Sequence, residues 1–345
     1  MNNLNQKKAT IKDVAELAEV SKTTISRYLN GQYEYMSIET KERIAKAIKK
    51  LNYRPSNIAR SLKSKKTGVI GCIIADIGSQ FSSIVVKGIN DVCKDMGYDV
   101  LFANTDNNSD REKDSIISLM DNKVDGLIIN TTGKIDDYLI DLSENGINIV
   151  LVDRCLKEIN KIDTVTTDNY KATYKCMEFL FNQGYKKIAF FTQDLTDNSS
   201  RYFRYDAYID AAKNFYEIDG NKYTYVIDNN NIDTFEKKLI DFRKECNGEE
   251  GVIFAVNGVI LLNVLHAMKN LNIKIKDDLG VCGYDDWGWA SLITPGITTI
   301  TQNSYDCGVQ SAKLLIDRIN KKDNSGTKFI EIPSELIIRG STNPK

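Results

Sequence analysis

The chain has 345 residues, 42% of them hydrophobic and 27% charged, which is typical of a folded protein with more than one domain. Residues 1–66 carry 15 Lys and Arg against 6 Asp and Glu, whereas the remainder carries 31 against 41, so we expect a polyanionic partner for the basic head alone. The longest apolar runs, such as 69–75, are too short to cross a bilayer and residues 1–9 hold no secretory leader, which predicts a cytoplasmic protein without a membrane partner.

The basic head has the pattern of a three-helix bundle within residues 10–51. Thr10 can cap a first helix. After a tight turn, Ser21 can cap a second helix, which ends before Gly31 because glycine tolerates a left-handed cap. Residues 38–51 predict a third helix with an apolar stripe at helical spacing. Two short helices joined by a tight turn predict an all-α helix-turn-helix domain.

A short helical stretch at 56–63 and a basic linker follow the head, and the pattern then changes. A helix this short is not stable alone. From residue 68 onward, apolar runs alternate with amphipathic stretches, which predicts α/β structure with parallel sheets, and the length favours two sheets. Strands are expected at 69–75, 100–104, 126–130, 149–153, 188–192, 223–227, 252–256 and 281–283. Helices are expected at 82–96, 111–122, 170–183, 202–215, 234–246 and 259–271.

The residues that could hold metals or do chemistry are scattered. Seven cysteines occur without a C-x-x-C pair, and the single histidine, His266, lies in an apolar helical pattern. There is no G-x-G-x-x-G and no G-x-x-x-x-G-K-[ST] fingerprint. We therefore expect buried reduced thiols, no metal, no cofactor, no catalytic residue and no enzymatic activity.

Several motifs resemble the LacI/GalR family of transcription regulators. In the head these are ATIKDVA at 9–15, TISR at 24–27, LNYRPS at 51–56 and ARSLK at 59–63. In the body they are VDGLI at 124–128, VDR at 152–154, GYDD at 283–286 and PGITTI at 295–300. The resemblance covers essentially the whole chain.

The resemblance implies a domain organisation. It gives a helix-turn-helix domain over 1–55, a hinge helix and linker over 56–67, and an effector-binding and dimerisation domain over 68–345. That last domain should consist of two periplasmic-binding-protein-like lobes joined by three crossovers. We expect the first lobe at about 68–167 and 298–325, and the second at about 168–297 and 326–343.

The second helix of the head is the expected reader of DNA. By the resemblance, Lys22, Thr23 and Arg27 hold base-reading positions in the major groove, and Arg27 can pair bidentately with guanine. Ser21, Thr24 and Ser26 suit phosphate contacts. The other expected DNA contacts are Thr10, Asn30, Tyr53, Ser56, Asn57, Ala59, Arg60, Leu62 and Lys63. In the family two hinge helices of a dimer enter the minor groove, where Leu62 would act as the wedge. The alternatives are a solvated face of a structural bundle and ordinary linker packing.

The effector should bind between the lobes, at the carboxyl ends of the parallel strands. The resemblance implies five polar contacts and two aromatic walls: Asp153, Arg204, Asn257, Asp285 and Gln302, with Phe81 and Trp287. Taken singly, an Asp or Asn at a strand end is equally a turn former or helix cap. The chain departs from the family at Gly258, where Asp is usual, and at Ala207, where Gly is usual.

The functional hypothesis is a homodimeric repressor of carbohydrate catabolism, released from double-stranded operator DNA by a small sugar or sugar acid. Residues 30–37, 105–107 and 130–133 are similar to a family branch that regulates hexuronate and pectin breakdown and responds to 2-keto-3-deoxygluconate. Alternatives are a co-repressing ligand and a sugar-binding body without regulated DNA binding. A transport binding protein would lack the basic head, and an architectural DNA-binding protein would not need the acidic body. The chain end carries no leucine heptad, which favours a dimer over a tetramer.

Overall fold

The computed structural model describes residues 9–29, 31–53, 66–227, 231–322 and 325–343. Contacts divide the chain into two units, one ending at Gly68 and one beginning at Val69. Among the described residues no helix is long and apolar enough to cross a membrane. All seven cysteines are buried, and none is in a disulfide.

The first unit is a small helical bundle. Its elements are α1 (Ile11–Leu17), α2 (Lys22–Leu29), the short 3-10 helix η1 (Tyr33–Tyr35) and α3 (Ile38–Lys50). A capping box starts α1, because Asp13 N donates to Thr10 Oγ1 (3.4 Å) and Thr10 N donates to Asp13 Oδ2 (2.7 Å). Val14, Ile25 and Ile44, one from each α-helix, are fully buried against one another. The helix-turn-helix domain expected from the sequence is therefore present.

The second unit contains two six-stranded sheets, and the first sheet is entirely parallel. Its order is β11-β5-β4-β3-β1-β2. These strands are β1 (Val69–Ile74), β2 (Asp99–Asn104), β3 (Gly126–Ile129), β4 (Ile149–Val152), β5 (Asp163–Thr167) and β11 (Phe329–Ile332). The helices that cover it are α5 (Gln80–Asp95), α6 (Ser109–Asp121), α7 (Asp136–Glu144) and α12 (Ser304–Ile319). Alternate residues of β1 pack in two separate cores, so helices protect both faces. We call this the first lobe.

The second sheet has the order β12-β10-β9-β8-β6-β7, with only β12 antiparallel to its neighbour. Its strands are β6 (Lys187–Thr192), β7 (Thr224–Val226), β8 (Gly251–Ala255), β9 (Gly280–Tyr284), β10 (Thr298–Thr301) and β12 (Glu335–Ile337). Its helices are α8 (Asn169–Asn182), α9 (Ser199–Phe215), α10 (Ile232–Cys246) and α11 (Gly258–Asn270), with short 3-10 turns η2 (Gly220–Tyr223) and η3 (Gly340–Thr342). One large aromatic-rich core fills this second lobe.

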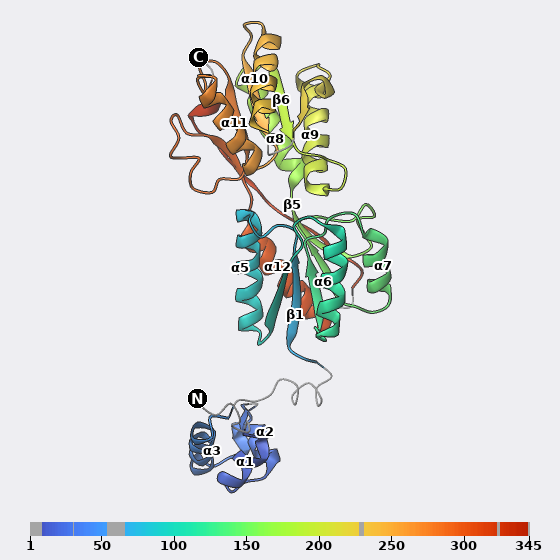
Figure 1. The fold of residues 1–345 in the computed structure, drawn as a ribbon, viewed down its shortest axis with the longest axis vertical. Coiled ribbons are helices and arrows are strands. Elements are labelled where there is room, and N and C mark those ends of the chain that lie inside the picture. Colours follow the sequence, from blue (N-terminus) through green and yellow to red (C-terminus); the bar gives the residue numbers. More distant parts are fainter. Residues whose placement is uncertain (1–8, 30, 54–65, 228–230, 323–324, 344–345) are drawn as a thin grey trace, which may run out of the picture. The chain divides into compact units, whose positions relative to one another are not determined.

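The chain passes between the lobes three times, after β5, after β10 and after β11. Helix α12 follows a strand of the second lobe but packs against α5 of the first lobe, as Figure 1 shows. This corrects the expected lobe boundaries at two strands. Strand β10 pairs with β9 in the second lobe, and β11 pairs with β5 in the first lobe. Each strand stays with its sheet through ladder hydrogen bonds, so the crossing falls after the strand and not before it.

Candidate functional site

Two aspartates stand at equivalent places in the two lobes, directly after a parallel strand. Asp153 follows β4 and Asp285 follows β9. Both adopt left-handed backbone conformations, with φ of 69° and 74°, which non-glycine residues rarely do. Their backbone N–H groups donate to the neighbouring strand, Asp153 to Val165 O and Asp285 to Ile300 O, both at 2.9 Å. Each aspartate therefore lies in a strained turn at the carboxyl end of its strand.

In the second lobe, Arg204, Gln302 and Asp285 form one hydrogen-bonded network. Arg204 Nη2 donates to Gln302 Oε1 (2.8 Å), and Gln302 Nε2 donates to Asp285 Oδ1 (2.7 Å). The guanidinium of Arg204 also lies over the Tyr284 ring, 3.6 Å from its centroid. Burial raises the pKa of Asp285, while the charge of Arg204 acts to lower it. The structure thus brings together three residues that the sequence predicted for one site.

In the first lobe, Asp153 makes contacts that reach across to the second lobe. Its Oδ2 accepts from Asn130 Nδ2 (3.0 Å) within the lobe. From the second lobe, Ser200 Oγ donates to the backbone oxygen of Asp153 at 2.9 Å. The neighbouring Cys155 N donates to Ser199 Oγ, also at 2.9 Å. The first turn of α9 therefore holds the two lobes together beside Asp153.

The remaining predicted effector residues lie in different surroundings. Asn257 caps α11, because its Oδ1 accepts from Ile260 N (3.0 Å), and its Nδ2 donates to Gln193 Oε1 (2.7 Å). Trp287 lies against Gly258, at the start of the same helix. Phe81 is only 9% exposed and belongs to the core of the first lobe. Its position favours packing over ligand contact.

Two arginines beside this network were not predicted as site residues. Arg154 follows Asp153 directly, is 9% exposed and donates from Nη1 to Thr131 O (2.9 Å). Arg201 lies in the first turn of α9 and donates from Nη1 to Asp194 O (2.7 Å). Burial and the nearby guanidinium groups of Arg154 and Arg204 lower the pKa of Arg201 to about 10. The sequence signal that could have found them is their position: Arg154 follows the strand-end residue Asp153, and Arg201 stands three residues before Arg204.

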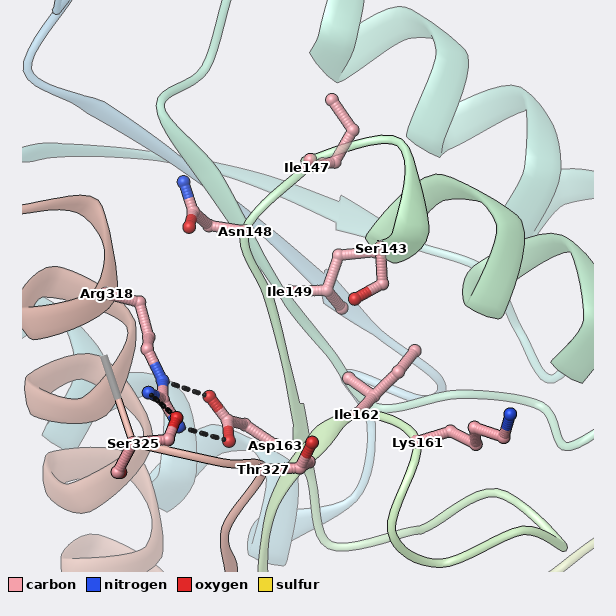
Figure 2. Close-up of a pocket in the computed structure, with 11 residues that line it drawn as sticks. Ser143, Ile147, Asn148, Ile149, Lys161, Ile162, Asp163, Arg318, Ser325 and Thr327 are labelled. Atoms are coloured by element: carbon pink, nitrogen blue, oxygen red, sulfur yellow. Dashed lines mark hydrogen bonds and ion pairs between the residues drawn. The ribbon is translucent and has the colours of Figure 1, made fainter. Parts of the chain in front are cut away.

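One pocket borders these residues, and a second pocket lies apart from them. A cavity of about 300 Å³ is lined by both lobes, including Cys155 and Leu156 from the first and Ser199 and Tyr202 from the second. A second cavity of about 230 Å³, shown in Figure 2, belongs to the first lobe and contains none of the predicted site residues. There Arg318 clamps Asp163, with Nε to Oδ2 at 2.7 Å and Nη2 to Oδ1 at 3.0 Å. That pair fastens the start of β5 to α12, which is a structural role.

On the helical unit, the three expected base-reading side chains, Lys22, Thr23 and Arg27, are all exposed on α2. Ser21 accepts a hydrogen bond from Thr24 N at 3.1 Å and so starts the helix. Among the other expected contacts, Thr10 is exposed, whereas Ser26 and Tyr53 are half-buried. The predicted contacts Asn30, Ser56, Asn57, Ala59, Arg60, Leu62 and Lys63 lie outside the described residues.

Comparison with known proteins agrees with this geometry. The family model for bacterial regulatory proteins of the lacI family matches residues 10–56, and the model for a periplasmic binding protein domain matches residues 70–323. The chain is 39% identical to the HTH-type transcriptional regulator KdgR of Bacillus subtilis, over 96% of this chain and 97% of that protein. It is 36% identical to the probable HTH-type transcriptional regulator EndR of Paenibacillus polymyxa, over 94% of each.

The fold is similar to that of the Lac repressor dimer bound to operator and the anti-inducer ONPF, with a TM-score of 0.82, 23% identity, and coverage of 98% of this chain and 100% of that one. The helix-turn-helix head, the two-lobed body and the sequence relatives all indicate the same family. The chain belongs to the LacI family of bacterial regulatory proteins and is a DNA-binding transcriptional regulator.

Proposed function

We propose that this regulator is a homodimer that represses carbohydrate catabolism genes and leaves its operator when a small sugar or sugar acid binds between the lobes. The observation that carries the proposal is the polar network at the crossovers, in which Arg204, Gln302 and Asp285 lie beside the lobe-bridging contacts of Asp153. Carboxylates and amides of this kind suit the hydroxyl groups of a sugar. Support also comes from relatives that are named as regulators, among them a ribose operon repressor.

The proposed DNA reader is the exposed face of α2. Lys22, Thr23 and Arg27 are available to base edges because none of them is needed for the core of the bundle. The excess of positive charge in residues 1–66 would supply the attraction to phosphates. We assign residues 1–55 to this domain, 56–67 to the hinge and 68–345 to effector binding and dimerisation, and we place the activity in the cytoplasm, where the operator is.

The proposed switch is a change in how the two lobes meet. A ligand that binds both lobes favours the lobe arrangement for which it has the higher affinity. Its effect on DNA binding cannot exceed the difference between its affinities for the two arrangements. The lobes meet through few hydrogen bonds at α9, such as those from Ser200 to Asp153 and from Cys155 to Ser199. We take induction as the default for a sugar effector, and a co-repressing ligand remains the alternative that the experiment below distinguishes. We propose no catalytic activity and no cofactor.

The test is fluorescence anisotropy of the purified protein with duplexes from its own promoter region, at fixed salt, with sugars, sugar acids and purines added singly. Salt is fixed because phosphate contacts dominate nonspecific binding. We expect one duplex to bind tightly and one sugar-class ligand to weaken that binding at least about tenfold, within the usual range of allosteric coupling. A ligand that tightens binding would instead identify a co-repressor. Failure of every duplex to exceed random DNA would refute the proposal.

A further inference from the structure

The cavity of about 300 Å³ that both lobes line lies apart from the predicted effector residues. Residues within 133–159 of the first lobe and 195–203 of the second form its walls. Over the described residues, this lining includes none of the seven expected to hold the effector. Ser199 lies in the wall, whereas the next residue, Ser200, donates to Asp153 O (2.9 Å). Consecutive residues of a helix point about 100° apart, so the two serines face different surroundings.

The walls of this cavity meet through direct contacts between the lobes. Gly133 of the first lobe has a φ of 79°, and a Cβ on it would lie 2.2 Å from Asp197 O of the second lobe. Only a glycine lets the two backbones approach so closely. Beside them, Lys134 Nζ lies 3.6 Å from Asp197 Oδ2, and Cys155 N donates to Ser199 Oγ (2.9 Å). The cavity therefore depends on this arrangement of the lobes, and a ligand that touches both walls favours it.

Apolar surface predominates in the lining, and both lobes contribute to it. The apolar side chains are Leu156 and Ile159 from the first lobe and Leu195, Tyr202 and Phe203 from the second. The rings of Tyr202 and Phe203 meet at 65°, with their centroids 6.4 Å apart. An apolar cavity of roughly 150 Å³ is enough to hold benzene. A ligand with a single six-membered ring therefore fits.

Asp136, the first residue of α7, gives the lining a negative charge. Its Oδ2 accepts from Lys157 N (3.0 Å), while its buried Oδ1 has no hydrogen-bond partner in the described part of the chain. Burial raises the pKa of Asp136, the contacts with Lys157 act to lower it, and the carboxylates of Asp137 and Asp197 raise it again. An ionised carboxylate can only accept hydrogen bonds, so the partner it lacks is a donor. A positively charged donor would also relieve the repulsion among these carboxylates.

We propose that this cavity is a second small-molecule site, which takes a primary amine attached to an aromatic ring and thereby holds the two lobes in this arrangement. The ring packs on Leu156, Tyr202 and Phe203, and the ammonium group donates to Asp136. The aromatic rings of the lining also attract a cation, an interaction that a neutral ligand does not gain. The inference goes beyond the proposed function and does not depend on it, because the cavity shares no residue with the predicted effector set.

The experiment is a ligand-observed NMR titration of the full-length protein with three probes: benzylamine, benzyl alcohol and methylamine. Benzyl alcohol keeps the ring without the charge, and methylamine keeps the charge without the ring. We expect benzylamine to bind at least about tenfold more tightly than either, because only benzylamine combines a charge-assisted hydrogen bond with burial of a ring.

Two variants separate the carboxylate from the cavity. Asp136→Asn keeps an acceptor for Lys157 N, and it should weaken benzylamine at least about tenfold while changing the affinity for benzyl alcohol by less than about threefold. Ile159→Trp enlarges a half-buried side chain of the lining and fills the cavity. It should weaken both benzylamine and benzyl alcohol at least about tenfold, because the ring no longer has room.

The matched control is Asp137→Asn, which removes the exposed carboxylate of the next residue of α7, outside the cavity lining. It should bind benzylamine within about twofold of the wild type, since exposed charges interact weakly. The inference is overturned if no probe binds, if benzyl alcohol or methylamine binds as tightly as benzylamine, or if either Asp136→Asn or Ile159→Trp keeps full benzylamine affinity.

Hydrogen–deuterium exchange of the wild type with saturating benzylamine locates the site without any substitution. Exchange should slow in residues 154–159 of the first lobe and 195–203 of the second, since both segments line the cavity. Slower exchange confined to residues 257–258 and 285–287 would place the amine among the predicted effector residues, and it would overturn the inference as well.

Discussion

The indole of Trp287 lies directly against Gly258, so that a Cβ on residue 258 would come within 2.6 Å of Cη2 of the ring. On its other side, Gly258 N donates to Asp285 Oδ2 at 3.0 Å. The glycine thus lets an aromatic ring and a buried carboxylate approach the start of α11 together. An aspartate at this position, which the resemblance led us to expect, would bring its Cβ against the ring and place a second carboxylate beside Asp285.

Gly258→Asp should therefore displace Trp287 and weaken effector binding at least about tenfold, because it adds a second carboxylate next to a buried one. The measurement is tryptophan fluorescence combined with ligand titration. The chain has two tryptophans, so a Trp289→Phe background leaves Trp287 as the reporter. An emission spectrum and a ligand affinity unchanged by Gly258→Asp would contradict the packing described above.

Periodicity identified the head and most of the body, but it could not identify elements whose residues look polar. Strand β5 has the sequence DTVTT, yet all five residues are buried, because the threonines are satisfied inside the sheet and at the crossover. Thr167 Oγ1, for example, donates to Gln302 Oε1 (2.9 Å) on the other lobe. Helices α7 and α12 were also absent from the predicted set. Helix α12 contains Gly308, which lowers helical propensity and is explained only by its tertiary partner.

The sequence predicted several residues of the candidate site, but it did not predict which contacts each of them makes. Arg204, Asp285 and Gln302 were named, and they do meet. Their hydrogen bonds join positions as much as 98 residues apart, and no local pattern encodes such pairing. Arg154 and Arg201, which lie near Arg204 and Asp153, were not predicted for the same reason, since a single arginine in a sequence is most often a solvated surface residue.

Arg27→Ala should weaken binding to the cognate operator by about 1–3 kcal/mol, the usual value of a bidentate arginine–guanine pair. Arg27 is exposed and lies 5.3 Å from the Tyr35 ring centroid, so its loss should change the stability of the bundle by less than about 1 kcal/mol. Anisotropy with the operator and a scrambled duplex separates the two kinds of contact. Arg43→Ala, an exposed change on α3, is the matched charge control. Equal weakening on both duplexes would mean that Arg27 contacts phosphate and does not read a base.

Gly308→Ala should destabilise the body through the packing of α12 on α5. A Cβ on Gly308 would lie 2.1 Å from Val85 O, and one on Gly88 would lie 2.3 Å from Tyr305 O. Both obstacles are backbone atoms, so the helices must separate. The overpacking cost, reduced by the better helical propensity of alanine, should lower the free energy of unfolding by about 1–3 kcal/mol. Urea unfolding followed by circular dichroism measures it. Gly326→Ala, where a Cβ meets open space, should have little effect, and an equal loss in both variants would count against this account.

Glu112 should make the stability of the first lobe depend on pH in a direction opposite to that of a surface carboxylate in an ion pair. It is fully buried, and burial raises its pKa despite the hydrogen bond from Thr132 N (3.0 Å) and the nearby charge of Arg154. A carboxyl whose pKa is higher in the folded state contributes its full stabilisation below the unfolded pKa of about 4.3 and loses it as the pH rises through the folded pKa. Glu112→Gln keeps an acceptor for Thr132 but does not titrate.

The free energy of unfolding of wild type minus that of Glu112→Gln should therefore fall as the pH is raised from about 4 to 7, since only the wild type must bury a growing charge. Urea titrations at a series of pH values give this difference directly. The control is Glu144→Gln, which removes an exposed carboxylate at the end of α7. The difference in the free energy of unfolding between wild type and this variant should be nearly independent of pH. A difference for Glu112→Gln that rises with pH would mean that Arg154 and the threonine hydrogen bonds outweigh burial, and that Glu112 is a stabilising partner of Arg154 in the folded protein.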